Sequence, residues 1–254
     1  KGNILPLNSS DFYFALGQNY LHLKDYKNAL EFTIKSIELS KPTDLHPLYN
    51  KNGQLGDIFS RTEMYEWAIQ AYDKKKVLMK EGNQYTEKDD ITYNLNIANL
   101  YISLNKYNDA NTYLDKLLNT QTISRSDLDL VYSLKSTVLL GQNKPIEANE
   151  FESKSFNLLK EEILELLPVL SNSERASLVT SKGAQLNSII ATSLLTSNYS
   201  PSNLAFDVIL FQKNLLLESE RAIYSIVSSD SLLKKQFEQF FDLKRKLSYL
   251  SSSL

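Results

Sequence analysis

The chain has 254 residues, 42% hydrophobic and 23% charged, with only 7 glycines and 6 prolines, a composition typical of a soluble globular protein built from long helices and short turns. Its formal net charge of −2 argues against a general nucleic-acid binder, because no domain-wide positive field would attract phosphates. The absence of cysteine excludes a disulfide, a thiolate zinc site and a cysteine nucleophile within these residues, and no apolar run reaches the roughly 18 residues of a membrane span.

A short motif recurs through the first part of the sequence, in which a tyrosine is followed three positions later by an alanine. Three clear copies and a weaker fourth read Tyr26-Lys27-Asn28-Ala29, Tyr65-Glu66-Trp67-Ala68, Tyr107-Asn108-Asp109-Ala110 and Pro145-Ile146-Glu147-Ala148. The alanines of successive copies lie 39, 42 and 38 residues apart. Such a period indicates stacked units, each too small to bury its own apolar face, and an array of this kind usually works by displaying a surface.

Each copy of the motif follows a segment in which a small residue precedes a large one by three positions. The small residue lies twelve positions before the alanine, and the pairs are Gly17 with Tyr20, Gly56 with Phe59, Ala98 with Tyr101, and Ser136 with Leu139. Small residues at matched positions predict two helices whose backbones approach closely, with the large side chains filling the adjacent grooves. The polar pairs at 24–25, 62–63 and 105–106 are predicted to be the turns between these helices.

These residues resemble the tetratricopeptide repeat. The resemblance implies an all-α fold, a right-handed α-solenoid of about four helix–turn–helix repeats over residues 1–165. The period exceeds the usual length of roughly 34 residues, so longer turns are expected, with 41–43 and 82–84 as candidates. The alternative is an ordinary helical bundle whose similarity to the repeat is accidental.

After the last alanine the period stops, and residues 166–254 are predicted to form a helical extension. Helices are expected over about 150–167, 173–196, 204–227 and 231–250, with a break around Pro201. The stretch 208–217 is apolar on most sides. A helix of that kind should be buried by its neighbours, which predicts that Leu210 and Leu217 are largely hidden.

The segment from Ala205 to Glu218 resembles the helix just before the catalytic part of CHAT-domain proteins, although Asn214 stands where that family often has glycine. Those proteins are caspase-like proteases, widespread in bacteria, that follow tetratricopeptide arrays. The resemblance implies that this chain is the regulatory half of a larger protease. The alternative is a free-standing scaffold or adaptor.

The chain itself is predicted to be no enzyme. Caspase-like chemistry needs a histidine and a cysteine, but the only histidines, His22 and His46, lie among the repeats and no cysteine exists. No cofactor and no metal site are expected, since two distant histidines without cysteine make a poor ligand set. The carboxylate pairs are interpreted as solvated helix faces, because nothing in the sequence indicates a cleft that would separate their pKa values.

The candidate site is distributed over the opening helix of each repeat, which in the repeat fold faces a concave groove. The polar positions predicted to point into it are Gln18, His22, Gln54, Asp57, Arg61, Asn96, Asn99, Ser133 and Thr137. Their amides and hydroxyls can form hydrogen bonds with a peptide backbone, while Asp57 and Arg61 can pair with charged peptide side chains. The set lacks the lysine and asparagine clamp with which some such repeats hold a terminal carboxylate, which disfavours that ligand. The alternative is that these positions are solvated or covered by the chain's own C-terminal helices.

The expected partner is therefore a protein or peptide in the groove, with a protease domain in cis as a further one. No nucleic acid partner and no membrane span are expected. A cytoplasmic location is favoured. The sequence starts at Lys1 without methionine, which leaves open whether an N-terminal leader has been removed.

Overall fold

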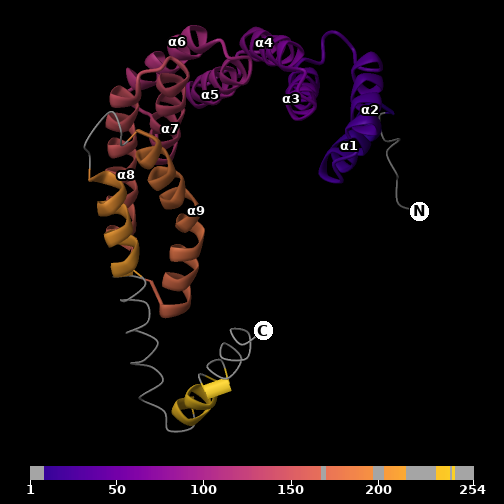
Figure 1. Ribbon diagram of the computed structural model, residues 1–254. Helices are drawn as coiled ribbons and strands as arrows, with labels where there is room; N and C mark the ends of the chain where they lie inside the picture. Colours follow the sequence, from indigo (N-terminus) through magenta and orange to yellow (C-terminus); the bar gives the residue numbers. More distant parts are fainter. Residues whose placement is uncertain (1–8, 167–169, 197–202, 216–232, 241, 244–254) are drawn as a thin grey trace, which may run out of the picture. The chain divides into compact units, whose positions relative to one another are not determined.

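The computed structural model describes residues 9–166, 170–196, 203–215, 233–240 and 242–243 (Figure 1). These residues form helices and the turns between them, which confirms the all-α class. The chain divides into two compact units, Lys1–Phe151 and Glu152–Leu254. Their boundary falls inside one helix. The division of repeats from extension at residues 165 and 166 rests on the sequence period and stays a prediction.

The first unit is a row of helical hairpins, each packed against the next. Its helices are α1 (Ser9–His22), α2 (Tyr26–Glu38), α3 (Leu45–Arg61), α4 (Tyr65–Glu81), α5 (Glu87–Ser103), α6 (Tyr107–Leu118), α7 (Arg125–Gly141) and the start of α8 (Pro145–Leu166). Helices α1 and α2, α3 and α4, and α5 and α6 pair closely, and α2, α4 and α6 contact the helix that follows. Contacts between α1 and α3 and between α5 and α7 place the opening helices of neighbouring hairpins side by side.

The turn within each hairpin has the same backbone geometry in all four copies. Lys24, Glu63, Asn105 and Asn143 have positive φ values of 60°, 62°, 57° and 60°. The next residue donates its backbone N–H to the carbonyl five positions earlier, as Asp25 does to Tyr20 at 2.9 Å and Lys144 does to Leu139 at 2.8 Å. This pattern satisfies carbonyls at the helix end. The three predicted turns are confirmed, and the weak fourth copy shares their geometry.

The repeated alanines are buried in the contacts between helices. Ala29, Ala68, Ala110 and Ala148 are all 0% exposed. A Cβ atom added to Gly17 would lie 3.3 Å from the Ala29 carbonyl oxygen, which confirms the close approach predicted for α1 and α2. Ala68 packs with Tyr72 of its own helix and with Ile97 and Leu100 of α5, so the same position also joins neighbouring hairpins.

We expect Ala68→Leu to lower the free energy of unfolding by about 1–3 kcal/mol, because the added atoms have no space in this contact. Gln70→Leu, at an exposed position on the same helix, is the control and should change stability by less than about 0.5 kcal/mol. Urea unfolding followed by far-UV circular dichroism measures both. Equal midpoints for the two variants would show that the repeat register is wrong.

A buried lysine joins the first two hairpins. Lys51 of α3 is 1% exposed, and its Nζ donates to Ser10 Oγ at 2.5 Å and to Ser40 Oγ at 2.7 Å. Burial lowers the pKa of Lys51, and the nearby carboxylates of Asp11 and Asp44 oppose that shift. The hydrogen bonds offset the desolvation of the ammonium and fix α3 against α1 and α2.

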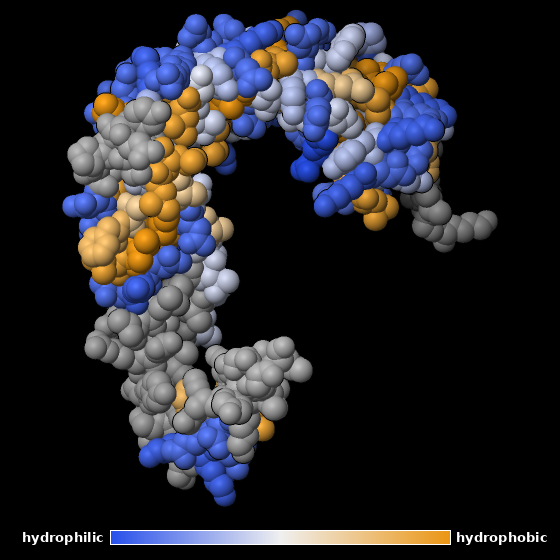
Figure 2. Space-filling view, in the orientation of Figure 1, coloured by the Kyte–Doolittle hydropathy of each residue, from blue (hydrophilic) through white to orange (hydrophobic). Residues whose placement is uncertain are grey.

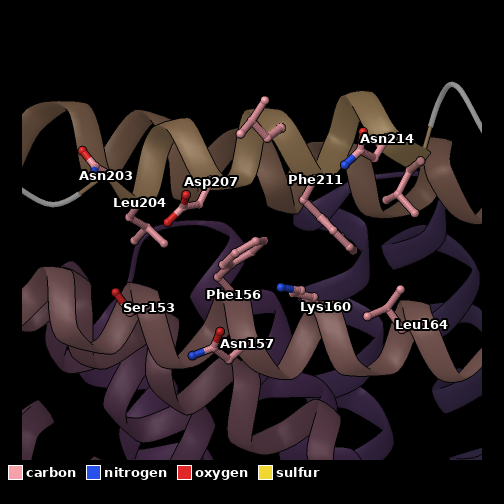
Figure 3. Close-up of a pocket in the computed structure, with 12 residues that line it drawn as sticks. Ser153, Phe156, Asn157, Lys160, Leu164, Asn203, Leu204, Asp207, Phe211 and Asn214 are labelled. Carbon is pink, nitrogen blue, oxygen red and sulfur yellow. The ribbon is translucent and has the colours of Figure 1, made fainter.

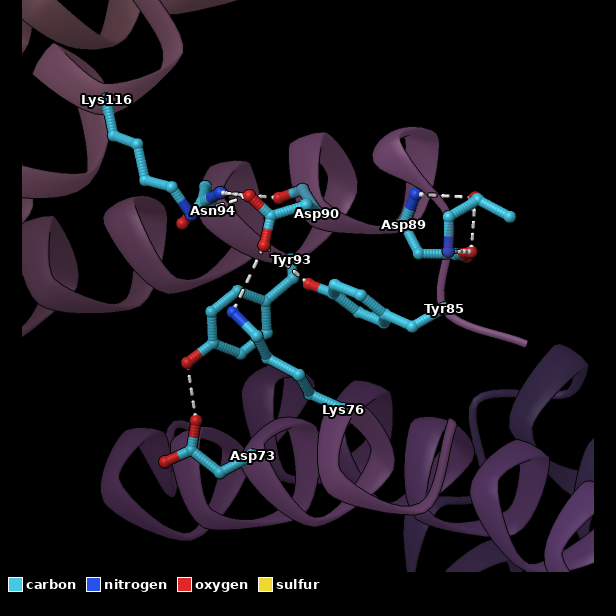
Figure 4. Close-up of polar contacts among 9 residues, drawn as sticks. Asp73, Lys76, Tyr85, Asp89, Asp90, Tyr93, Asn94 and Lys116 are labelled. Carbon is cyan, nitrogen blue, oxygen red and sulfur yellow. Dashed lines mark hydrogen bonds and ion pairs between the residues drawn. The ribbon is translucent and has the colours of Figure 1, made fainter. Parts of the chain in front are cut away.

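The second and third hairpins are joined by a carboxylate with several donors (Figure 4). Asp90 of α5 accepts from Lys76 Nζ of α4 at 3.2 Å, from Tyr85 Oη at 2.8 Å and from Lys116 Nζ of α6 at 2.6 Å. Desolvation of Asp90 opposes ionisation, but the hydrogen bonds from Lys116, Tyr85 and Lys76 outweigh it and hold the pKa of this carboxyl well below its usual range. Asp90 therefore stays charged and ties three helices together.

An aromatic ring completes this contact. The Lys76 ammonium lies 3.7 Å from the centroid of the Tyr93 ring, and Tyr93 Oη donates to Asp73 Oδ1 at 2.6 Å (Figure 4). Burial, together with the hydrogen bond to Asp73, raises the pKa of the Tyr93 phenol well above its usual range. The hydroxyl therefore remains a donor at neutral pH.

The second unit is built on the remainder of α8, α9 (Asn172–Thr196) and a helix over residues 204–215. Their common core consists of Phe156, Leu159, Ile163, Leu186, Ile189, Leu204, Val208 and Leu215. The helix over 204–215 turns Leu204, Val208 and Leu215 inward at helical spacing, so it is amphipathic.

The prediction that Leu210 is hidden is wrong. Leu210 is 43% exposed and Phe206 is 60% exposed, because α8 and α9 cover only one side of the helix. Hydrophobic side chains on this part of the second unit are visible in Figure 2. Leu217, for which burial was also predicted, lies outside the described residues. Part of the last predicted helix is present over 233–240.

Candidate interaction groove

The opening helices of the first three hairpins border a hollow of about 630 Å³. Its lining comes from α1, α3, α4 and α5: Phe14, Gln18, Leu21, His22, Asn50, Gly53, Gln54, Asp57, Tyr72, Lys75, Thr92 and Asn96. Apolar and polar side chains share the lining, with Phe14, Leu21 and Tyr72 among the former. Carboxamides from three different helices, α1, α3 and α5, line the same space.

Five of the nine side chains predicted for a groove line this hollow, namely Gln18, His22, Gln54, Asp57 and Asn96. The other four do not. Arg61, Asn99, Ser133 and Thr137 are exposed on α3, α5 and α7, and Thr137 Oγ1 donates to the Ser133 carbonyl oxygen at 3.1 Å. The structure therefore brings together the predicted residues of the first three hairpins, whereas a role in binding stays a prediction for all nine.

Sequence reasoning missed the contribution of α4. Tyr72 and Lys75 reach the hollow because α3 carries glycine where their side chains cross it. A Cβ atom at Gly56 would lie 2.6 Å from the Tyr72 ring, and one at Gly53 would lie 3.2 Å from Lys75 Cδ. The spacing Gly53-x-x-Gly56 is the signal that could have indicated two side chains lying over this helix.

Tyr72 and Asp57 form a fixed pair in the groove. Tyr72 Oη donates to Asp57 Oδ1 at 2.5 Å. Burial of the phenol, together with the charge of Asp57, raises the pKa of Tyr72 well above its usual range, so the hydroxyl stays protonated at neutral pH. The hydrogen bond holds the Asp57 carboxylate in one orientation at the edge of the hollow.

Gln54 carries an acceptor that has no partner in the described part of the chain. Its side chain is 6% exposed, and its Nε2 donates to Thr33 Oγ1 at 2.8 Å. Thr33 Oγ1 donates its only proton to the Ala29 carbonyl oxygen at 2.7 Å. Toward Gln54 the hydroxyl can therefore only accept, so the amide must present its Nε2 to Thr33. Gln54 Oε1 is buried without a hydrogen bond among the described residues. Such an atom favours a ligand that brings an N–H donor.

A second hollow, of about 800 Å³, lies within the second unit between α8 and the helix over 204–215 (Figure 3). Phe156 and Phe211 point toward each other across it, with ring centroids 5.7 Å apart in an edge-to-face arrangement. Lys160 Nζ lies 6.0 Å from the Phe211 ring centroid. This hollow has an aromatic floor but no buried polar side chain among its lining residues, so it offers less for specific recognition than the groove of the first unit.

Comparisons with known proteins agree with the repeat geometry. Residues 10–43 and 91–121 match the tetratricopeptide repeat family, so the chain contains tetratricopeptide repeats. No curated protein matches the sequence significantly. The fold is an α-solenoid of the tetratricopeptide type.

Several solved structures share the fold at low sequence identity. A putative kinesin light chain from Podosopora anserina with nearly identical TPR-like repeats has 11% identity and a TM-score of 0.58, over 85% of this chain and 99% of that one. BtubC (BKLC) from P. vanneervenii has 12% identity and a TM-score of 0.52, over 87% and 84%. The apo form of RapI has 14% identity and a TM-score of 0.51, over 88% and 87%. These likenesses establish the fold alone.

Metal-ligand clusters and membrane-spanning helices are both absent from the part of the chain that the structure describes. No group of three or more histidine, aspartate or glutamate side chains is placed to hold a metal ion there. Nor does any described helix combine the length and apolar character needed to cross a membrane.

Proposed function

We propose that this chain is a non-catalytic interaction module that binds an extended peptide segment of a partner protein in the groove of the first unit. The convergence of Gln18, Asn50, Gln54 and Asn96 on one hollow supports this proposal most directly. A carboxamide both donates and accepts, so a row of them matches the alternating N–H and C=O groups of a peptide backbone. The unpartnered acceptor of Gln54 adds a position that a peptide N–H would satisfy.

Site-specific photo-crosslinking tests this proposal. p-Benzoylphenylalanine is placed at Gln18 or Asn96 in the groove, and at Glu31 as a control, which is exposed on α2 outside the lining. In a lysate of the source cell, we expect the two groove positions to capture the same protein and Glu31 to capture none of it. Capture of that protein from Glu31 with equal yield, or from neither groove position, would contradict binding in the groove.

We further propose that the chain is the sensing and regulatory half of a CHAT-type caspase-like protease. The support is the resemblance of residues 205–218 to the helix that precedes the catalytic part of such proteins. Sequencing the gene beyond Leu254 tests this: a histidine and a cysteine on two predicted strands are expected there. Their absence would favour a free-standing scaffold or adaptor, with the groove proposal unchanged.

The purified chain is expected to show no peptidase activity. Cysteine is absent, and among the described residues neither His22 nor His46 hydrogen-bonds a serine or threonine that it would activate. Fluorogenic peptide substrates measure this, with the chain resolved by size exclusion before the assay. Turnover that follows the protein peak and survives further purification would contradict the expectation.

A further inference from the structure

We propose that the groove selects a peptide with a single internal acidic side chain, which is seated against Lys75. This inference rests on the proposed function of the groove as a peptide site. It adds which type of peptide side chain the groove recognises. It follows from three neighbouring side chains of the lining: Lys75, Gln54 and Asp57.

Lys75 places a positive charge at the side of the groove. It is half-buried, and its Nζ lies 3.5 Å from the position that a Cβ atom of Gly53 would take, so the ammonium rests on α3 at the side of the hollow. Within the described residues it forms no hydrogen bond and no ion pair. The next residue, Lys76, is instead engaged by Asp90 and the Tyr93 ring.

A carboxylate is the ligand group that fits this ammonium. Partial burial strengthens the attraction between opposite charges, and a charged hydrogen bond is stronger than a neutral one. The side chain of Lys75 is also restricted by its path over Gly53, so less freedom is lost when it binds. Glutamate or aspartate within a peptide supplies the carboxylate without the terminal clamp that the sequence lacks.

Gln54 supplies the second contact. It follows Gly53 on α3, and its Oε1 is the acceptor without a partner. A peptide residue offers a backbone N–H beside its side chain. One acidic residue can therefore donate to Gln54 through its backbone while its carboxylate binds Lys75.

Asp57 limits the number of acidic residues. It lies four residues beyond Gly53 on α3, which is about 6 Å along the helix axis, and Tyr72 holds its carboxylate in place. A second acidic residue near Asp57 would meet a like charge. The groove therefore favours one acidic residue flanked by neutral or basic ones over an acidic run or another polyanion.

The test is a selection from random dodecapeptides displayed on phage, with the full chain as bait. We expect the enriched peptides to share one aspartate or glutamate. The Lys75→Glu bait should enrich lysine or arginine at that position, because the charge in the groove is reversed. Lys74→Glu is the matched control, since Lys74 is exposed beside Lys75 but outside the lining, and its bait should enrich the same motif as the unchanged chain.

Affinities of synthetic peptides complete the test. Replacing the acidic residue of the selected peptide by its amide should weaken binding to the unchanged chain by about tenfold or more. For Lys75→Gln, which keeps the length of the side chain and is less disruptive than Lys75→Glu, the same replacement should change affinity less than about twofold. Circular dichroism of each variant confirms that it is folded.

The two levels of the proposal fail separately. If no peptide family is enriched, or if enriched peptides compete equally well after Gln18→Arg and Asn96→Arg block the groove, the groove is not a peptide site. If peptides bind in the groove but carry no shared acidic residue, or if their acidic preference persists in the Lys75→Glu bait, the assignment to Lys75 is overturned and the groove function stands.

Discussion

Replacing Asp90 with asparagine should lower the free energy of unfolding of the first unit by about 2–4 kcal/mol at neutral pH. The variant keeps the shape of the side chain but removes the charge that Lys76 and Lys116 share. The Lys76 ammonium, half-buried against the Tyr93 ring, then loses the Asp90 carboxylate as its counter-ion. Trp67 is the only tryptophan and lies in this unit, so its fluorescence during urea unfolding reports the change selectively.

The pH dependence of the same variant identifies the cause. The pKa of Asp90 in the folded chain lies below its unfolded value, so the stabilisation from this carboxylate is present above about pH 4 and is lost as the pH falls through the folded pKa. The stability difference between the unchanged chain and Asp90→Asn should therefore shrink between pH 7 and pH 3. A constant difference would mean that the donor and acceptor pattern of the amide, not the lost charge, accounts for the loss.

The control for this prediction removes the same charge elsewhere in the unit. Glu81 is exposed at the end of α4, and its side chain forms no hydrogen bond or ion pair among the described residues. Glu81→Gln should change stability by less than about 0.5 kcal/mol at every pH. A loss as large as that of Asp90→Asn would point to net charge rather than to the network.

Much of the fold follows from local sequence. The turns at Lys24, Glu63 and Asn105 were predictable because each falls between a small residue and an alanine at fixed spacing, and repetition of the pattern reduced the chance of a false match. The weak fourth copy keeps the same turn at Asn143 although its tyrosine and aromatic positions are lost. The geometry of the turn depends on the backbone of the helix end more than on those side chains.

The groove was only partly predictable, because its details depend on contacts between helices. Gln54 was predicted to point into the groove, and it lines the hollow, but the sequence did not show that it is buried against the Thr33 hydroxyl of α2. Lys75 and Tyr72 enter the groove from α4 only because Gly53 and Gly56 of a different helix leave room. A single sequence shows the glycines but not which side chains cross them.

Leu215→Ala should lower the free energy of unfolding of the second unit by about 2–5 kcal/mol, whereas Leu210→Ala should cost less than about 1 kcal/mol. Both leucines belong to the helix over 204–215, but Leu215 is 5% exposed in the core and Leu210 is 43% exposed beside the hollow. The apolar content of this helix had predicted burial on all sides. Apolar content alone does not fix how many neighbours are available, and here α8 and α9 cover one face.

The pair of variants distinguishes these two pictures. Far-UV circular dichroism follows unfolding of the whole chain, and Trp67 fluorescence, which reports the first unit, should be unchanged in both variants. If Leu210→Ala is as costly as Leu215→Ala, the outer face of the helix is covered in solution, as the sequence first suggested. If only Leu215→Ala is costly, the exposed face with Phe206 and Leu210 is accessible. Such a face would then bind a hydrophobic dye more strongly than a Leu210→Ser variant does.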